Sequence, residues 1–371
     1  MNVRAVVSHL VAAVVAFGLG YVVFSSHAPK SPVRSGSDPI AEFADILAIG
    51  DVHSRTQALL DFFAAADPAW AERLRDAVDP AAESRIVLDE ISEALFASWW
   101  ARTNPEAAFE RRLDPAWSNR NPWLREVMLA WTPKDPTRAA QAALTLPLNA
   151  DRGSVEAARV LVDHWWDNPQ SNDPTPLVDL IRKLEVVPRA GAIQRLIEKS
   201  IEHRGLDATE KFVESLPPEE DVGISVQKEV MARFAQSALV HDKSRAIAFA
   251  DKHGRGRDGS GVLRHLAFSW GQKNGPEALE WAKGIADVEL RPEIVNRVWL
   301  SYNQAKPEDS IAWVEAQEPS LALETVLNRY LAGIGAQGQA EKALKLAERA
   351  KDSELRDRLR ATVAIGWSRN D

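Results

Sequence analysis

The sequence predicts an all-α protein, in which an α-solenoid of stacked helical hairpins follows one N-terminal transmembrane helix. Three observations favour this fold class. An uncharged apolar stretch lies near the N-terminus, apolar residues in the rest of the chain recur at helical spacing, and bulky rings return about every 32 residues. After Asp38, no run of alternating β-branched residues favours a strand.

The apolar stretch predicts a membrane anchor. Residues Ala5–Ser26 carry no formal charge, and as a helix they span about 33 Å, enough for a bilayer core. A cleaved signal peptide is the alternative, but the stretch is long for one, and its best cleavage site is followed by Pro29. The short segment 1–4 and the absence of cysteine favour an N-terminus inside and a repeat domain exported to the periplasm. We therefore expect a single-pass inner-membrane protein in which residues 27–40, rich in Pro, Ser and Gly, form a linker.

The interval between bulky rings predicts repeated hairpins over residues 41–371. The interval from Trp99 to Trp131 equals that from Trp270 to Tyr302, and Trp281 and Trp313 on the expected second helices are separated by the same interval. A small residue stands three positions before each second-helix ring, and the second helices start at signals such as Asp135-Pro136 and Lys306-Pro307. A hairpin cannot bury both faces alone, so such units must stack. The rings expected to pack between helices are Trp99, Trp131, Trp165, Trp270, Trp281, Tyr302 and Trp313.

These residues resemble the tetratricopeptide-repeat family over most of residues 85–350. That family places three apolar residues on a first helix, then a small residue and an aromatic on a second, which is the order of Leu263, Leu266, Trp270, Ala278 and Trp281. The period is about 32 rather than 34, and the small residue stands three rather than four positions before the ring, so a HEAT-like or untyped solenoid stays open. The resemblance implies a scaffold that binds other proteins or peptides in a groove lined by the first helices.

One register position predicts a partner-binding surface. The residue after the first apolar position of the first helix is polar in five expected units, namely Glu93, Arg125, Arg159, Arg264 and Asn296. If the units stack as in the family, a row of guanidinium groups suits the carboxylates of an acidic or C-terminal peptide. A solvated helix face is the alternative. Trp100, Trp117, Trp123 and Trp166 fall outside the ring register, so some of them are candidates for exposed interface anchors.

Composition limits the other classes of function. The chain has 371 residues, and 53 Asp and Glu outnumber 45 Lys and Arg, which gives a formal net charge of −8 and argues against nucleic-acid binding. Because the chain has no cysteine, disulfides, thiolate metal sites and cysteine nucleophiles are excluded. The histidines have no ligand spacing, so we expect no cofactor.

An enzyme is the alternative hypothesis. Residues Ile46–Phe62 contain Gly-Asp-x-His and resemble the first motif of calcineurin-like metallophosphoesterases, which implies Asp51 and His53 as metal ligands. The further motifs of that family are missing, apart from a fragment at Asn149–Gly153. The other interpretation of the segment is a turn in which Asp51 or Ser54 caps a helix. An architectural, self-associating protein is a third possibility.

Overall fold

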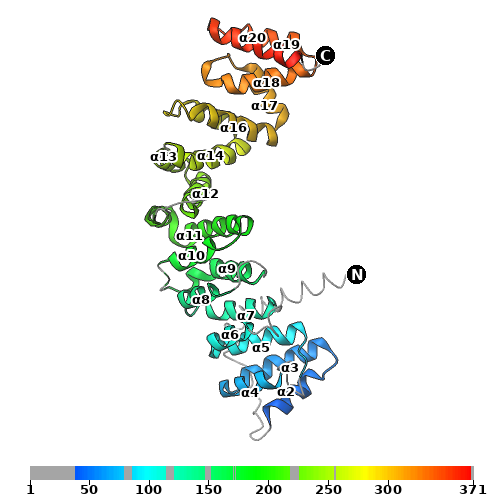
Figure 1. Cartoon of the computed structure of the whole chain (residues 1–371). Helices are drawn as coiled ribbons and strands as arrows, with labels where there is room; N and C mark the ends of the chain where they lie inside the picture. Colours follow the sequence, from blue (N-terminus) through cyan, green and yellow to red (C-terminus); the bar gives the residue numbers. More distant parts are fainter. Residues whose placement is uncertain are drawn as a thin grey trace. The chain divides into compact units, whose positions relative to one another are not determined.

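The computed structural model is all-helical, as the sequence predicts (Figure 1). The structure describes residues 38–78, 86–113, 121–146, 152–169, 171, 173–217, 225–254 and 256–368. In these residues the chain forms nineteen α-helices, α2 to α20, three short 3-10 helices and no strand. It divides into two compact units, Met1–Glu185 and Val186–Asp371, which are described separately.

The first unit contains three successive helix pairs after a short helical start. The start consists of α2 (Pro39–Leu47), α3 (Val52–Ala65), the 3-10 helix η1 (Pro68–Trp70) and α4 (Ala71–Ala77). The pairs are α5 (Glu90–Thr103) with α6 (Pro105–Leu113), α7 (Asn121–Trp131) with α8 (Pro136–Ala143), and α9 (Arg152–His164) with α10 (Thr175–Arg182); η2 (Trp165–Asp167) follows α9. Helix α7 contacts both α5 and α9, so the first helices of neighbouring pairs lie side by side.

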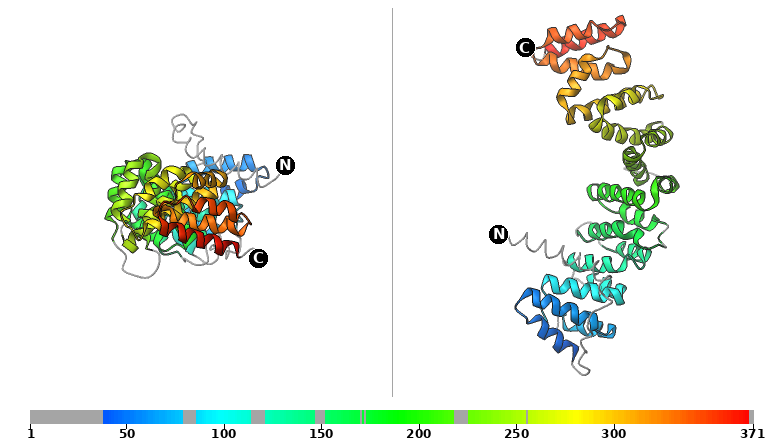
Figure 2. Two further views of the ribbon diagram at one scale, coloured as in Figure 1. Left: turned by 90° about the horizontal axis from the view of Figure 1, so that it is seen from above. Right: turned by 180° about the vertical axis from the view of Figure 1, so that it is seen from behind.

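The second unit repeats this arrangement. After the long α11 (Val186–Ser215), the pairs are α12 (Val226–His241) with α13 (Lys243–His253), α14 (Gly256–Lys273) with α15 (Gly275–Lys283), α16 (Arg291–Ala305) with α17 (Pro307–Ala316), and α18 (Glu324–Ala336) with α19 (Ala340–Ala347). The 3-10 helix η3 (Leu321–Leu323) precedes α18, and α20 (Ser353–Trp367) follows α19. Successive first helices α12, α14, α16, α18 and α20 contact one another in order, and Figure 2 shows this order from behind.

Gly205 divides α11 into the two helices of another pair. Its φ of 77° and ψ of 171° are not helical, and this region of backbone space is open to glycine at little steric cost. The Thr209 hydroxyl donates a hydrogen bond to the carbonyl oxygen of Gly205 at 2.8 Å, across the first turn after the break. Residues 186–204 and 206–215 therefore act as first and second helix.

Caps and prolines explain where the second helices begin. The side chains of Asp135, Asp242 and Asn274 each accept a hydrogen bond from a backbone N–H in the first turn of α8, α13 and α15. Pro136 and Pro307 stand at the first positions of α8 and α17, where a missing N–H costs no helical hydrogen bond. Helices α8, α13, α15 and α17 thus start at the residues that the sequence marks.

Several of the recurrent rings lie between helices. Trp131 of α7 meets Phe109 of the preceding pair with ring centroids 6.0 Å apart. Tyr302 of α16 lies so close to Gly275 of the preceding pair that a Cβ there would stand 2.0 Å from the ring. Trp270 packs against Trp281 of its own pair at 5.4 Å. Trp99 and Trp165 are also buried, whereas Trp281 and Trp313 are partly exposed.

Two tryptophans outside the ring register lie in the core. Trp100 and Trp123 are each 1% exposed and meet edge to face at 5.9 Å, so among the four candidates these two are not exposed anchors. They belong to an aromatic cluster that runs from α2 to α7 through Phe43, Phe63 and Phe96. Trp166 is partly exposed, and Trp117 lies outside the described residues.

The predicted anchor, residues 5–26, lies outside the described residues. Among the residues that are described, no helix has the length and apolar character needed to cross a bilayer. Helix α2 begins at Pro39, with Asp38 as its cap, so helical structure starts within the last residues of the predicted linker 27–40.

Candidate functional site

The structure brings Arg125 and Arg159 to one carboxylate. Arg125 lies on α7 and Arg159 on the neighbouring α9, and both form ion pairs with Glu156 of α9, at 3.4 and 2.6 Å. Arg125 also pairs with Glu126 at 3.2 Å. Burial raises the pKa of Glu126, although the Arg125 and Arg102 guanidinium groups act in the opposite direction. The predicted row in the first unit is therefore a mixed charge cluster.

Arg264 has the same kind of partner in the second unit. Its guanidinium group binds both carboxylate oxygens of Glu293 on the next first helix, α16, with an Nη2–Oε2 distance of 3.0 Å. These hydrogen bonds lower the pKa of Glu293. Arg358 of α20 holds Glu324 of α18 in the same two-pronged way, at 2.6 and 3.2 Å. Arg–Glu pairs between successive first helices thus recur along the unit.

The remaining two predicted groove residues behave differently. Glu93 of α5 is only 6% exposed, so its carboxylate is not presented at the surface. Asn296 of α16 is partly buried, and its Oδ1 accepts no hydrogen bond from the described residues. Asn328, which occupies the equivalent position on α18, uses the same atom to accept a hydrogen bond from Thr362 of α20 at 2.9 Å.

These contacts change what the three arginines can do. Because Arg125, Arg159 and Arg264 already bind carboxylates of their own unit, a partner's carboxylate would have to compete with Glu156 or Glu293. Exposed ion pairs contribute little to stability, so replacing one of these glutamates with a partner's carboxylate would cost the protein little stability. For the same reason, the new ion pair would contribute little to the affinity for the partner. Sequence reasoning missed both glutamates. The sequence signal for these glutamates is an acidic residue nearly one repeat after an arginine. Glu156 follows Arg125 in this way, and Glu293 follows Arg264.

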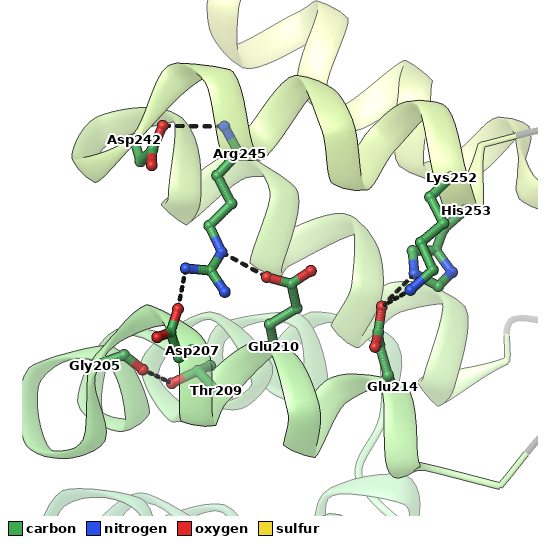
Figure 3. Close-up of polar contacts among 9 residues, drawn as sticks. All are labelled: Gly205, Asp207, Thr209, Glu210, Glu214, Asp242, Arg245, Lys252 and His253. Atoms are coloured by element: carbon green, nitrogen blue, oxygen red, sulfur yellow. Dashed lines mark hydrogen bonds and ion pairs between the residues drawn. The ribbon is translucent and has the colours of Figure 1, made fainter.

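The second helices carry a separate polar cluster, shown in Figure 3. Arg245 of α13 reaches Asp207 and Glu210 of α11, the latter at 2.5 Å, while its own backbone N–H is capped by Asp242. Lys252 and His253 of α13 both bind Glu214 of α11, at 2.7 and 2.8 Å, and the bond from Lys252 is the main cause of the lowered pKa of Glu214. Three carboxylates of one pair therefore bind three basic side chains of the next, so these polar groups have partners within the protein.

The Gly-Asp-x-His segment forms a helix start. Asp51 accepts a hydrogen bond from the Ser54 N–H at 2.8 Å and caps α3, so the capping interpretation describes its geometry. Hydrogen bonding by the Ser54 side chain, and next by its backbone N–H, lowers the pKa of Asp51. His53 is exposed in the first turn of α3, no strand precedes it, and no group of three or more His, Asp or Glu suited to a metal occurs among the described residues. Residues 149–151 of the second fragment lie outside the described residues.

A comparison with models of protein families found no match, and neither did comparisons with curated proteins and with solved structures.

Proposed function

We propose that this chain is a membrane-anchored scaffold that binds other proteins through the first helices of its hairpins. The observation that carries the proposal is the side-by-side order of first helices in each unit. These helices are α5, α7 and α9 in the first unit and α12, α14, α16, α18 and α20 in the second. Such an order presents side chains of the same register position at regular intervals, as an extended partner segment requires. On this proposal the pairs form a divergent tetratricopeptide-like solenoid.

The proposal includes the location of the protein. The uncharged residues 5–26 supply a bilayer-spanning length, and the sequence from 27 to 37 supplies a spacer rich in Pro, Ser and Gly. The folded units would then lie on the periplasmic side of a bacterial inner membrane. A scaffold tethered in this way meets its partners at raised local concentration, which favours the capture of weakly binding segments.

Site-specific photo-crosslinking in the native membrane tests the proposal. A benzophenone amino acid replaces Phe268 on the first helix α14 in one variant and Ile311 on the second helix α17 in the other. The two side chains are matched, being 38% and 37% exposed. We expect protein adducts from position 268 and few from position 311. Absence of protein adducts at 268 and at a second first-helix position, 300, would overturn the proposal, and so would equal adducts at 311.

A further inference from the structure

Four basic side chains occupy one register position on consecutive first helices of the second unit. Arg233 lies on α12, His265 on α14, Arg297 on α16 and Arg329 on α18, and each stands one repeat interval after the one before. We call these four residues the basic row. The row lies one position after Arg264 and Asn296, so it is distinct from the groove that the sequence predicts.

Three side chains of the row, those of Arg233, His265 and Arg297, are neighbours in space as well as in register. The guanidinium groups of Arg233 and Arg297 both act electrostatically on His265, so the three lie along adjacent helices. Arg297 also lies over the ring of Phe268 on α14, with Cζ 5.8 Å from the ring centroid, which orients its guanidinium group. Helix α18, which carries Arg329, contacts α16. The row therefore crosses four consecutive helices.

No carboxylate in the described part of the chain forms an ion pair with any member of the row. Arg233 donates to the side-chain oxygen of Gln236 at 3.1 Å, and Arg297 and Arg329 are exposed. The acidic groups in the first turns of α12, α16 and α18 are occupied: Arg189 pairs with Glu229, Arg264 with Glu293, and Arg358 with Glu324. Arg297 lies within electrostatic range of Glu293, but Arg264 takes both oxygens of that carboxylate. The row thus differs from the basic side chains in Figure 3, which bind carboxylates of the neighbouring helix.

The spacing of the row sets the geometry of a ligand. Axes of packed helices lie about 10 Å apart, so the four side chains of the row span about 30 Å. A polyproline II segment rises about 3.1 Å per residue with three residues per turn, and its every third side chain points the same way at intervals of about 9 Å. Carboxylates at every third position of such a segment would therefore lie opposite successive side chains of the basic row. In a β-strand, side chains on one face repeat at about 7 or 13 Å and would fall between them.

The surroundings of the row favour a peptide over other polyanions. Phe268 and Leu300 stand three residues after His265 and Arg297 on the same helix faces, and both are accessible to a partner's apolar side chains. The net charge of −8 would repel a long nucleic acid or an anionic membrane, which must lie against more of the surface than the row. A single narrow segment covers less of the acidic surface, and the nearest carboxylates, such as Glu293, are already paired with arginines.

We infer that the basic row binds an extended acidic segment of a partner protein, with a carboxylate at every third residue. The inference rests on the proposed function and makes it more specific, because it states the chemistry of the partner segment that the scaffold would bind. Arg233, Arg297 and Arg329 supply charge-assisted hydrogen bonds to three carboxylates, and His265 supplies an imidazole N–H to the fourth.

Fluorescence anisotropy with the purified full chain in detergent tests the inference. The probe is a labelled peptide of four Glu-Pro-Pro repeats, compared with a peptide of the same composition in which the four Glu are adjacent. The variant Arg233→Gln, Arg297→Gln, Arg329→Gln removes the row, and the matched control Lys211→Gln, Lys273→Gln, Lys306→Gln removes three exposed charges of the same unit away from it. A third variant with Lys at the three arginine positions keeps the charge.

We expect the spaced peptide to bind wild type and the control at least about tenfold more tightly than the row variant, which corresponds to about 1.4 kcal/mol. The Lys variant should retain most of the affinity, and raised salt should weaken binding. Equal affinity for the spaced and clustered peptides, or unchanged binding by a row variant of native helicity, would overturn the inference. So would row-dependent binding to anionic vesicles that exceeds binding to the peptide. The photo-crosslinking test at position 268 does not depend on the charges of the row. If protein adducts form at position 268 but substitution of the row leaves peptide binding unchanged, the inference fails and the proposed scaffold function remains supported.

Discussion

His265 is held between two positive groups. It is half-buried on α14, and burial, followed by Arg233 on α12 and Arg297 on α16, lowers the pKa of its imidazole below the ordinary value of 6.5. The unfolded chain, in which His265 titrates near its ordinary value, therefore binds the proton more readily than the folded chain. The stability associated with the neutral ring is present above about pH 6.5, and it is lost as the pH falls from there through the folded-state pKa.

We expect the substitution His265→Gln to reduce the acid sensitivity of the second unit. Between pH 7.5 and pH 5, the wild type should lose more thermal stability than the variant, because glutamine binds no proton in either state. Differential scanning calorimetry of the full chain measures the loss. His203→Gln on α11, an exposed position, is the control, and an equal flattening of the pH profile in that variant would contradict the role of His265.

Single residues also mark the limit of what the pattern could predict. The period identified Trp131, Trp270 and Tyr302 as rings between helices, because a packing position recurs in every repeat. Trp100 and Trp123 fall outside that period, yet they fill an aromatic core at the start of the array. The pairing of Arg125 and Arg264 with glutamates has only a weak signal in the sequence, an acidic residue nearly one repeat later. Whether the two side chains meet depends on how far one helix is displaced along the next, which the spacing in the chain does not give.

Two glycines allow close packing between first helices in the second unit. A Cβ at Gly271 of α14 would stand 2.0 Å from Ser301 Oγ and 2.6 Å from the carbonyl oxygen of Val298, both on α16. A Cβ at Gly366 of α20 would meet the carbonyl oxygen of Ala332 on α18 at 2.7 Å. In contrast, the Cβ position at Gly333 of α18 has no atom within 4 Å. Only the first two glycines are required by their neighbours.

This difference leads to opposite effects of one substitution. Gly271→Ala should destabilise the protein by about 1–3 kcal/mol, because the new methyl group must displace the backbone of α16. Gly333→Ala should stabilise it by up to about 1 kcal/mol, because alanine favours the helix and fills open space. Urea denaturation followed by circular dichroism measures both. A neutral result for Gly271→Ala would show that α14 and α16 do not approach as closely as described.

Helix boundaries were largely predictable, because Asp and Pro mark the starts of α8, α13, α15 and α17. The pair within α11 was less evident from the sequence, because the ring spacing is stretched between residues 145 and 225. There, a single glycine with positive φ makes the turn that Asp or Pro makes elsewhere. A glycine signals such a turn weakly, since glycine also occurs within helices, as at Gly271 and Gly333.

At the scale of the whole molecule, the proposed anchor predicts a defined topology. A reporter enzyme that is active only in the periplasm should be active when fused after Asp371 and inactive when fused before residue 1. The physical reason is that the short N-terminal segment is retained inside while the units are exported. Activity of a cytoplasm-specific reporter at Asp371 would contradict this orientation, and release of the chain from membranes by alkaline carbonate would contradict the anchor.

The all-α class of the molecule could be predicted from periodicity alone, because every hairpin carries the same helical signal. A binding surface could not be located in the same way. The arginines selected from the sequence are engaged with Glu156 and Glu293, whereas the basic row emerges only when the repeat interval is followed one position further along the first helices. Choosing that position requires knowledge of which charges the neighbouring helices already neutralise.

The equal interval between first helices in the second unit has a consequence for how such a chain can change. Removing or duplicating one whole hairpin leaves every other hairpin in register, since each contacts mainly its neighbours. The number of side chains offered to a ligand would then change by one, while their separation stays constant. If the basic row binds a segment as we infer, the length of that segment would be adjustable in whole steps by gene duplication, without redesign of any helix.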